Sequence, residues 1–214
     1  MVEDKEIKAT IKSVLGTFVK SGRPNQASAF FLKAINSLSE NAVFGCVLPS
    51  SIFTLDIYNS LRNHISEISN FKIIGKLGNY VFEDALTDVS IIVGIKNRIN
   101  FPPKLIWTKN EKGVAQEALR ELRKLQANNE IAISKNSYSI YTPERFPILE
   151  NNWRIISLNE NKFITDLNVY IGARKLIKLQ EIFTVYQGAL LGTKDVFTIS
   201  EDNFPNVQRR FVNR

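Results

Sequence analysis

The residue whose type and position most suggest chemistry is Phe82, in the stretch NYVFEDALTDVSIIVGIK at residues 79–96. Two apolar runs that predict paired strands flank it, and buried hairpins usually turn on Gly, Asn or Asp instead of an aromatic. A fixed aromatic face at the mouth of a hairpin can stack on a flat ligand such as a nucleic-acid base. The alternative is that Phe82 closes the open end of the sheet.

Other reactive residue types occur singly or in unfavourable pairs. His64 is the one histidine, so metal binding fails by ligand count, and a satisfied surface or core histidine is expected. Cys46 lies in the apolar run AVFGCVLP and is expected to be a small buried core residue in a reducing compartment. Glu83 and Asp84 are adjacent, so their side chains point apart and suit shared acid–base work poorly.

Nucleophile and phosphate-binding motifs are absent from the sequence. It contains no G-x-S-x-G, no Walker A lysine loop and no G-x-G-x-x-G, and the two glycines of GALLG follow no plausible first βα turn. We therefore predict no catalytic residue and no metal site in this chain.

The elements around Phe82 predict an α/β fold. Apolar residues at helical spacing and continuous apolar runs distinguish the helices from the strands. Helices are expected at 3–19, 26–38 and about 50–68, and strands at 41–49, 71–78 and 89–96. The uniformly apolar strand at 41–49 is expected to be central and buried on both faces. The order predicts a partial doubly wound, Rossmann-like sheet with a terminal antiparallel hairpin.

After Lys96 the pattern changes to a mixed α+β segment. RINFPPKLIW is extended because of its prolines, KGVAQEALRELRKLQ is an amphipathic helix, and short strand-like pieces follow. We predict two domains, at residues 1–126 and 127–214.

Composition indicates an anionic partner. The chain of 214 residues has a net charge of +7 and a pI of about 9.5, which favours nucleic acid. Cations concentrate between residues 96 and 124, where Lys96, Arg98, Lys104 and Lys109 are expected to face DNA phosphates. No apolar run reaches about 18 residues and the N-terminus has no signal-peptide pattern, so we predict a cytoplasmic protein without a membrane partner.

Five pieces of the sequence, taken in order over about residues 20–108, resemble one family. They are ASAFFLKA, VFGCVLPSS, LRNHI, IIGKLGNYVFEDALTDVSIIVGIK and LIW. The order and spacing are similar to the later half of the catalytic domain of adenine-N6 DNA methyltransferases of restriction-modification systems.

The resemblance implies roles for three residues. Phe82 matches the aromatic of a "vF" motif that stacks on an adenine flipped out of the duplex, as an enzyme acting on a base edge requires. Phe30 matches the position where an aromatic packs against the adenine ring of S-adenosylmethionine, although a core helix residue is the alternative. Pro49 matches the proline that ends a strand and shapes the pocket floor.

The end of the chain resembles the start of a target-recognition region. VYQGALLGTKDVF is similar to the "G…G…vF" segment that follows a helical linker in combined restriction-methylation enzymes. If so, Lys194 and the basic stretch at 96–124 would approach the phosphates of double-stranded DNA.

The sequence also departs from this family. The glycine-containing cofactor loop and the Asn-Pro-Pro-Tyr tetrapeptide are missing; in the family both precede the helix with Phe30, and only 29 residues precede it here. NFPP at 100–103 comes after the hairpin and lacks the following aromatic. We therefore expect a fragment that methylates nothing alone and binds S-adenosylmethionine weakly or not at all.

Three functions stay open at this point. The chain is the later half of a methyltransferase catalytic domain that pairs with a missing N-terminal half, a non-catalytic DNA-binding or interaction module derived from that fold, or an α/β domain unrelated to nucleic acid. If the chain is half of a catalytic domain, we expect an exposed sheet edge and a tendency to form homo-oligomers.

Overall fold

The computed structural model describes residues 5–19, 25–82, 87–99, 101–128, 132–149, 152–173, 175–177 and 179–182. The chain divides into two compact units, Met1–Leu167 and Asn168–Arg214. The sheet and all of its covering helices belong to the first unit. The functional boundary expected at residue 126 stays a prediction; β5 and β6, which lie beyond it, join the same sheet.

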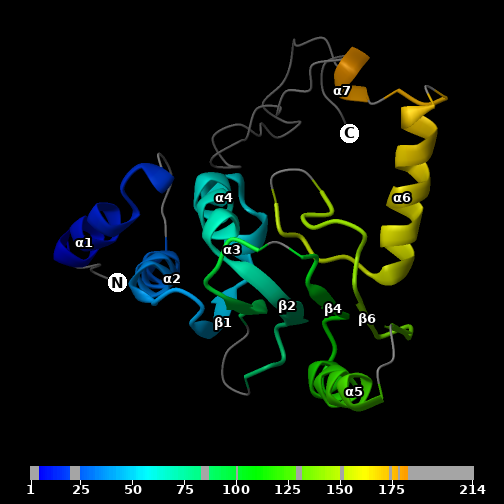
Figure 1. Ribbon diagram of the computed structural model, residues 1–214, viewed down its shortest axis with the longest axis horizontal. Helices are drawn as coiled ribbons and strands as arrows, with labels where there is room; N and C mark the ends of the chain where they lie inside the picture. Colours follow the sequence, from blue (N-terminus) through cyan, green and yellow to red (C-terminus); the bar gives the residue numbers. More distant parts are fainter. Residues whose placement is uncertain are drawn as a thin grey trace, which may run out of the picture. The chain divides into compact units, whose positions relative to one another are not determined.

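The first unit is built on a mixed six-stranded sheet (Figure 1). Its strands, in chain order, are β1 (Val43–Pro49), β2 (Asn70–Gly78), β3 (Val89–Ile95), β4 (Lys104–Thr108), β5 (Ile133–Ser134) and β6 (Tyr138–Tyr141). In the sheet they run β1-β3-β2-β4-β6-β5, and only β2 and β4 pair in parallel. The chain is therefore α/β with an open mixed sheet.

The position of β3 determines which loops meet. β3 pairs antiparallel with β1 on one side and with β2 on the other, so that Pro49 and Gly78 both lie opposite Val89. The carboxyl ends of β1 and β2 and the residues at 79–82 and 87–88 therefore lie at one edge of the sheet, which we call the carboxyl edge. In open α/β sheets, ligands bind at this edge.

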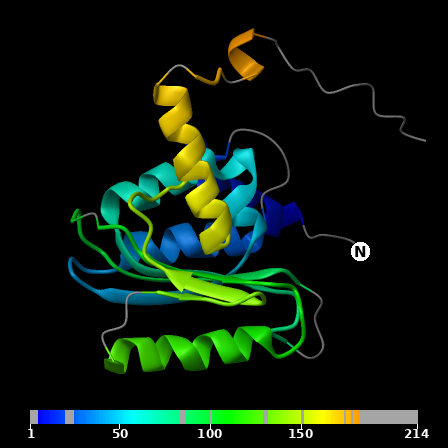
Figure 2. The ribbon, with the colours of Figure 1, turned by 90° about the vertical axis from the view of Figure 1, so that its right-hand side faces the viewer.

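Helices cover both faces of the sheet (Figure 2). The helices α1 (Lys5–Leu15), α2 (Gln26–Ser37), α3 (Ser51–Thr54) and α4 (Asn59–Ile68) lie on one side, and α5 (Val114–Asn128) lies on the other. Leu32, Ile52 and Ile65 from the first group share one core with Ile74 and Ile92 of the sheet. A second, smaller core lies under α5 and uses the opposite side chains of β2, β4 and β6.

The prediction that the strand at 41–49 is central and buried on both faces is wrong. Among the described strands β1 pairs only with β3, and it lies at the end of the sheet. Phe44 and Leu48 face the core, whereas Val43 and Val47 are 69% and 57% exposed. The run is apolar throughout because one face packs under the helices, while no described element covers the other face.

The single helix expected at about 50–68 is three short pieces. The helix α3 is followed by η2 (Asp56–Tyr58), a 3-10 turn, and then by α4. Arg62 holds them together: it is 1% exposed, and its Nη1 donates to the carbonyl oxygens of Ile52 at 2.8 Å and Leu55 at 2.9 Å. Its Nη2 also donates to the side chain of Asn59. Burial lowers the pKa of Arg62 to about 10, and nearby Asp56 partly opposes this.

The later elements are less buried. The helix α6 (Leu158–Gly172) begins with a capping box, in which Ser157 and Glu160 exchange hydrogen bonds. The helix α7 (Leu179–Ile182) belongs to the second unit.

Within the described ranges, no helix combines the length and the apolar character that a membrane span requires.

Replacing Arg62 with alanine should lower the free energy of unfolding by about 2–4 kcal/mol, because two buried carbonyl groups lose their donors. Urea denaturation followed by circular dichroism measures this. Arg120→Ala, an exposed arginine on α5, is the control and should change the value little. An equal loss in both variants would contradict the role of Arg62.

Candidate functional site

A pocket of about 430 Å³ lies at the carboxyl edge of the sheet. Pro49 and Ser50 line it from the end of β1, Lys76 from the end of β2, and Thr87 and Asp88 from the chain that enters β3. These positions are distant in sequence, and the pairing of β3 between β1 and β2 brings them together. The volume lies within the range of small-molecule sites, about 300–1,000 Å³.

The segment at 152–157, which is neither helix nor strand, supplies further lining residues. Trp153 is 1% exposed, and its backbone N–H donates to the carbonyl oxygen of Phe53 at 2.8 Å. Its ring packs edge-on against the ring of Phe53, with 5.6 Å between the ring centroids. The hydroxyl of Tyr141 donates to the carbonyl oxygen of Ile156 at 3.0 Å. Trp153 and Ile155 are buried while Arg154 between them is exposed, and all three line the pocket.

The polar lining of the pocket is rich in hydrogen-bond donors. The hydroxyls of Ser50 and Ser90, both buried, lie 2.7 Å apart and share one hydrogen bond. Lys76 and Arg154 add two cations, and Asp88 adds one carboxylate. Sequence analysis did not single out any of these five residues, because no motif links positions so far apart.

Phe82 is placed near this edge of the sheet, four residues after the end of β2. Its side chain is 51% exposed, and Tyr80 beside it is 44% exposed. Such exposure places Phe82 outside the core, and closure of the open end of the sheet stays the alternative. The next residues, 83–86, including Glu83 and Asp84, lie outside the described ranges. Base stacking by Phe82 stays a prediction.

Phe30 and Pro49 occupy different environments. Phe30 is 71% exposed, although its neighbours Phe31 and Leu32 on α2 are fully buried. The alternative of Phe30 as a core helix residue is therefore wrong, and the ring is available to a ligand or a partner. Pro49 is half-buried and lines the pocket. Phe30 does not line this pocket, so the structure does not bring the two expected cofactor contacts together there.

The cations expected to face DNA lie at two ends of the sheet. Lys96 and Arg98 follow β3 and lie at the edge opposite the pocket, whereas Lys104 begins β4 opposite Ile73, midway along β2. The nine-residue β2 separates the two edges by roughly 26 Å at about 3.3 Å per residue. Lys96 is also engaged locally, since its Nζ donates to the carbonyl oxygens of Asn36 and Leu38 at the end of α2.

Lys109 differs from these three because it follows β4 at the carboxyl edge. Next to it, the side chain of Asn110 accepts a hydrogen bond at 2.7 Å from the N–H of Asn79. This contact ties the end of β2 to the end of β4. Lys194 and the VYQGALLGTKDVF segment lie outside the described residues, so their expected DNA contacts stay predictions.

The isolated reactive residues behave largely as expected. His64 Nε2 lies 3.2 Å from the side-chain oxygen of Asn36, and its ring lies 4.7 Å from that of Phe18, which makes it a satisfied histidine. Cys46 is a free thiol whose pKa is raised by burial, but it is only half-buried because β1 is an edge strand. The described residues contain no cluster of His, Cys, Asp and Glu suited to a metal ion.

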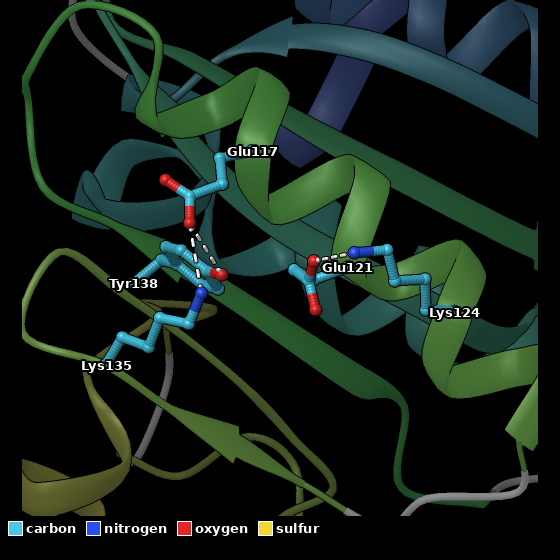
Figure 3. A network of polar contacts seen from close by, with 5 residues as sticks. All are labelled: Glu117, Glu121, Lys124, Lys135 and Tyr138. Carbon is cyan, nitrogen blue, oxygen red and sulfur yellow. Dashed lines mark hydrogen bonds and ion pairs between the residues drawn. The ribbon is translucent and has the colours of Figure 1, made fainter.

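A second polar cluster joins α5 to β5 and β6 (Figure 3). Glu117 accepts hydrogen bonds from Lys135 Nζ at 3.0 Å and from the hydroxyl of Tyr138 at 3.1 Å. Hydrogen bonds from Lys135 and Tyr138 lower the pKa of the Glu117 carboxyl. Both donors are satisfied by the Glu117 carboxylate, so we assign this cluster to stability.

Comparisons with solved structures find restriction-modification proteins. The type IIG restriction endonuclease BpuSI matches at 16% identity with a TM-score of 0.49, over 77% of this chain and 19% of that one. A modification subunit of a putative type I restriction enzyme from Vibrio vulnificus YJ016 matches at 15% and 0.48, over 70% and 34%. The type I restriction enzyme EcoKI M protein matches at 10% and 0.44, over 75% and 48%.

No protein-family model and no curated protein matches the sequence. This chain covers about a fifth of BpuSI and a third of the Vibrio vulnificus subunit. At such identities and TM-scores these likenesses carry no argument about activity.

Replacing Tyr141 with phenylalanine should lower the free energy of unfolding by about 1–3 kcal/mol, because the buried carbonyl of Ile156 loses its donor. Burial, together with the charge of Glu160, raises the pKa of Tyr141, so its hydroxyl stays a donor at neutral pH. Chemical denaturation measures the loss. Tyr80→Phe, at an exposed tyrosine, should have little effect, and equal values would contradict the assignment.

The Glu117 cluster should make stability depend on pH. Because the folded-state pKa of Glu117 lies below its ordinary 4.5, its stabilisation is present above pH 4.5 and is lost as the pH falls through the folded value. Glu117→Gln should therefore lower Tm at pH 7 and have progressively less effect as the pH falls below 4.5. Scanning calorimetry at several pH values tests this, with exposed Glu67→Gln as the control. A difference that persists unchanged in acid would contradict it.

Proposed function

We propose that this chain is part of an S-adenosylmethionine-dependent DNA methyltransferase that modifies the N6 nitrogen of adenine in a restriction-modification system. It would supply the later half of the catalytic domain and the start of the target-recognition region. The Asn-Pro-Pro-Tyr and glycine-loop motifs would come from a partner polypeptide or a longer chain. The chain alone would be inactive, and double-stranded DNA would be the substrate.

The observation that carries this proposal is the position of Phe82. The side chain is half exposed, next to the carboxyl edge where Pro49 and Asp88 line a pocket. An enzyme that modifies a base edge must extrude the base, and an exposed aromatic at the ligand-binding edge of an α/β sheet is suited to receive it. Stacking of a base on an aromatic contributes about 1–3 kcal/mol.

The residues present fit only part of an S-adenosylmethionine site. Phe30 offers an exposed ring that can pack against the adenine of the cofactor. When bound, the cofactor supplies an electrophilic methyl group for transfer to the amino nitrogen. We assign no described residue to the carboxylate or the ribose of the cofactor. Our proposal therefore predicts that this chain alone binds S-adenosylmethionine weakly or not at all.

The uncovered side of β1 supports a missing half. Val43 and Val47 are exposed on an edge strand whose outer backbone groups have no strand partner among the described residues. Such an edge invites another strand. We propose that the N-terminal half of the catalytic domain binds there, and that without it the chain forms homo-oligomers through the same edge.

A non-catalytic DNA-binding or interaction module is the second candidate. It is favoured by the net charge of +7, which suits an anionic partner without requiring chemistry. The two candidates differ in whether a polypeptide with the missing motifs restores methyl transfer.

Co-expression tests the proposal in a bacterial host that lacks adenine methylation. The chain is produced with a polypeptide that carries the glycine loop and the Asn-Pro-Pro-aromatic tetrapeptide, taken from the reading frame upstream or from a neighbouring gene. Purified complexes are assayed for transfer of a labelled methyl group to adenine in DNA. We expect activity from the complex and none from either part; no activity from any such pair would favour the binding module.

In the active complex, Phe82→Ala should lower the rate of methyl transfer about tenfold, because the extruded base loses its stacking partner. Phe82→Trp should retain most of the rate. Phe101→Ala is the matched control, since Phe101 is an exposed aromatic at the opposite edge of the sheet, and it should leave the rate unchanged. The same rate for Phe82→Ala and the wild type would overturn the role of Phe82.

A further inference from the structure

The pocket at the carboxyl edge has a firm apolar floor. Phe53 and Trp153 line it, both are 1% exposed, and Trp153 also packs edge-on against Phe71 at 5.0 Å between ring centroids. The backbone hydrogen bond from Trp153 to Phe53 fixes these two residues relative to each other. The pocket therefore does not need to form on binding.

Hydrogen-bond donors outnumber carboxylate acceptors in the lining of this pocket. In the pair of Ser50 and Ser90 hydroxyls, one hydrogen is used between them, so the other is left to donate. Neither Lys76 nor Arg154 makes a side-chain hydrogen bond or ion pair within the described ranges. The ligand that completes this arrangement is rich in acceptors.

Charge favours an anion over a neutral acceptor. Two cations line the pocket against the single carboxylate of Asp88, which is exposed. Glu160, near Lys76 and Arg154, does not line the pocket, and it accepts its hydrogen bonds from Ser157. A guanidinium and an ammonium beside a hydroxyl donor suit a phosphate group, which accepts charge-assisted hydrogen bonds on several oxygens.

We propose that this pocket holds a nucleotide phosphate, with Lys76 and Arg154 as its cationic ligands and the Ser50–Ser90 pair as a hydroxyl donor. The attribution of that phosphate to a DNA strand, next to the nucleotide that Phe82 receives, rests on the proposed function. The phosphate site itself rests only on the pocket.

Arg154 and Lys76 reach the pocket from two different parts of the fold. Arg154 is carried by the segment at 152–157, whereas Lys76 belongs to the sheet, so a phosphate between them would join the two. A strand held there is fixed by backbone contacts, which position DNA without reading its sequence.

Binding of small probes to the purified chain tests the site. Amide chemical shifts are recorded by NMR during titration with dAMP, 2′-deoxyadenosine and inorganic phosphate. We expect dAMP and phosphate to shift residues around the pocket, including Thr54, Lys76 and Ile155, and dAMP to bind more tightly than the nucleoside. Lys76→Gln and Arg154→Gln should each weaken dAMP binding about tenfold without affecting the nucleoside.

Matched controls separate a site from general charge. Lys72→Gln, an exposed lysine on the same strand β2, and Arg145→Gln, an exposed arginine, should bind dAMP like the wild type. Arg154→Lys should recover part of the affinity. Preserved dispersion of the amide spectrum shows that each variant is folded.

A short single-stranded oligodeoxynucleotide distinguishes the source of the phosphate. If the site serves DNA, replacement of one central phosphodiester by an uncharged methylphosphonate should weaken binding to the wild type and not to Lys76→Gln. The site is overturned if dAMP produces no saturable shifts at the pocket, or if both glutamine variants bind dAMP like the wild type. Phosphate binding with an inactive co-expressed complex would uphold the pocket and overturn only the proposed methyltransferase function.

Discussion

The antiparallel ladder of β3 with both β1 and β2 is the constraint on which the rest of the structure depends. Because β3 enters between two strands that point the same way, the end of β1, the end of β2 and the start of β3 meet at one edge. Pro49, Lys76 and Asp88, separated by tens of residues, therefore line one pocket. Removing β3 would separate β1 from the sheet and would leave Phe82 without a defined position.

The second contribution comes from the segment at 152–157, which completes the pocket from the far end of the unit. Two hydrogen bonds hold it, from the backbone N–H of Trp153 to the carbonyl oxygen of Phe53 in α3 and from the hydroxyl of Tyr141 in β6 to the carbonyl oxygen of Ile156. Leu158, which follows the segment, donates its backbone N–H to the hydroxyl of Ser139 in β6. These contacts to α3 and β6 position the segment that carries Arg154.

Much of the fold could be predicted from the sequence, because apolar periodicity reports local structure directly. The bounds of α2, β2 and β3 lie within one or two residues of those expected. The position of β1 in the sheet could not be predicted, because a strand with a continuous apolar sequence can have one or both of its faces covered. The break at Leu55 and the burial of Arg62 were also missed, since a charged residue at a helical position normally indicates a solvated face.

Some residues of the candidate site could be predicted from the sequence, and others could not. Phe82 was singled out because an aromatic in a turn is unusual for its local context, and Phe30 because of its position in a family pattern; both roles stay predictions. Lys76, Arg154 and the Ser50–Ser90 pair gave no local signal, since they are ordinary residues whose meaning comes only from being adjacent. The cations at 96–104 illustrate the converse, because closeness in sequence placed them in one group while the sheet separates them from Lys109.

The insertion of β3 between β1 and β2 also has a consequence for biosynthesis. The chain leaves the ribosome from its N-terminus, so β1 and α2 emerge well before the strand that pairs with β1. Until residue 95 is outside the exit tunnel, β1 lacks its partner β3, and its apolar run is open to chaperones or to other nascent chains. Pairing across such a distance in sequence also makes the closing step slow. The time at which β3 emerges therefore sets the earliest moment at which β1 can join the sheet.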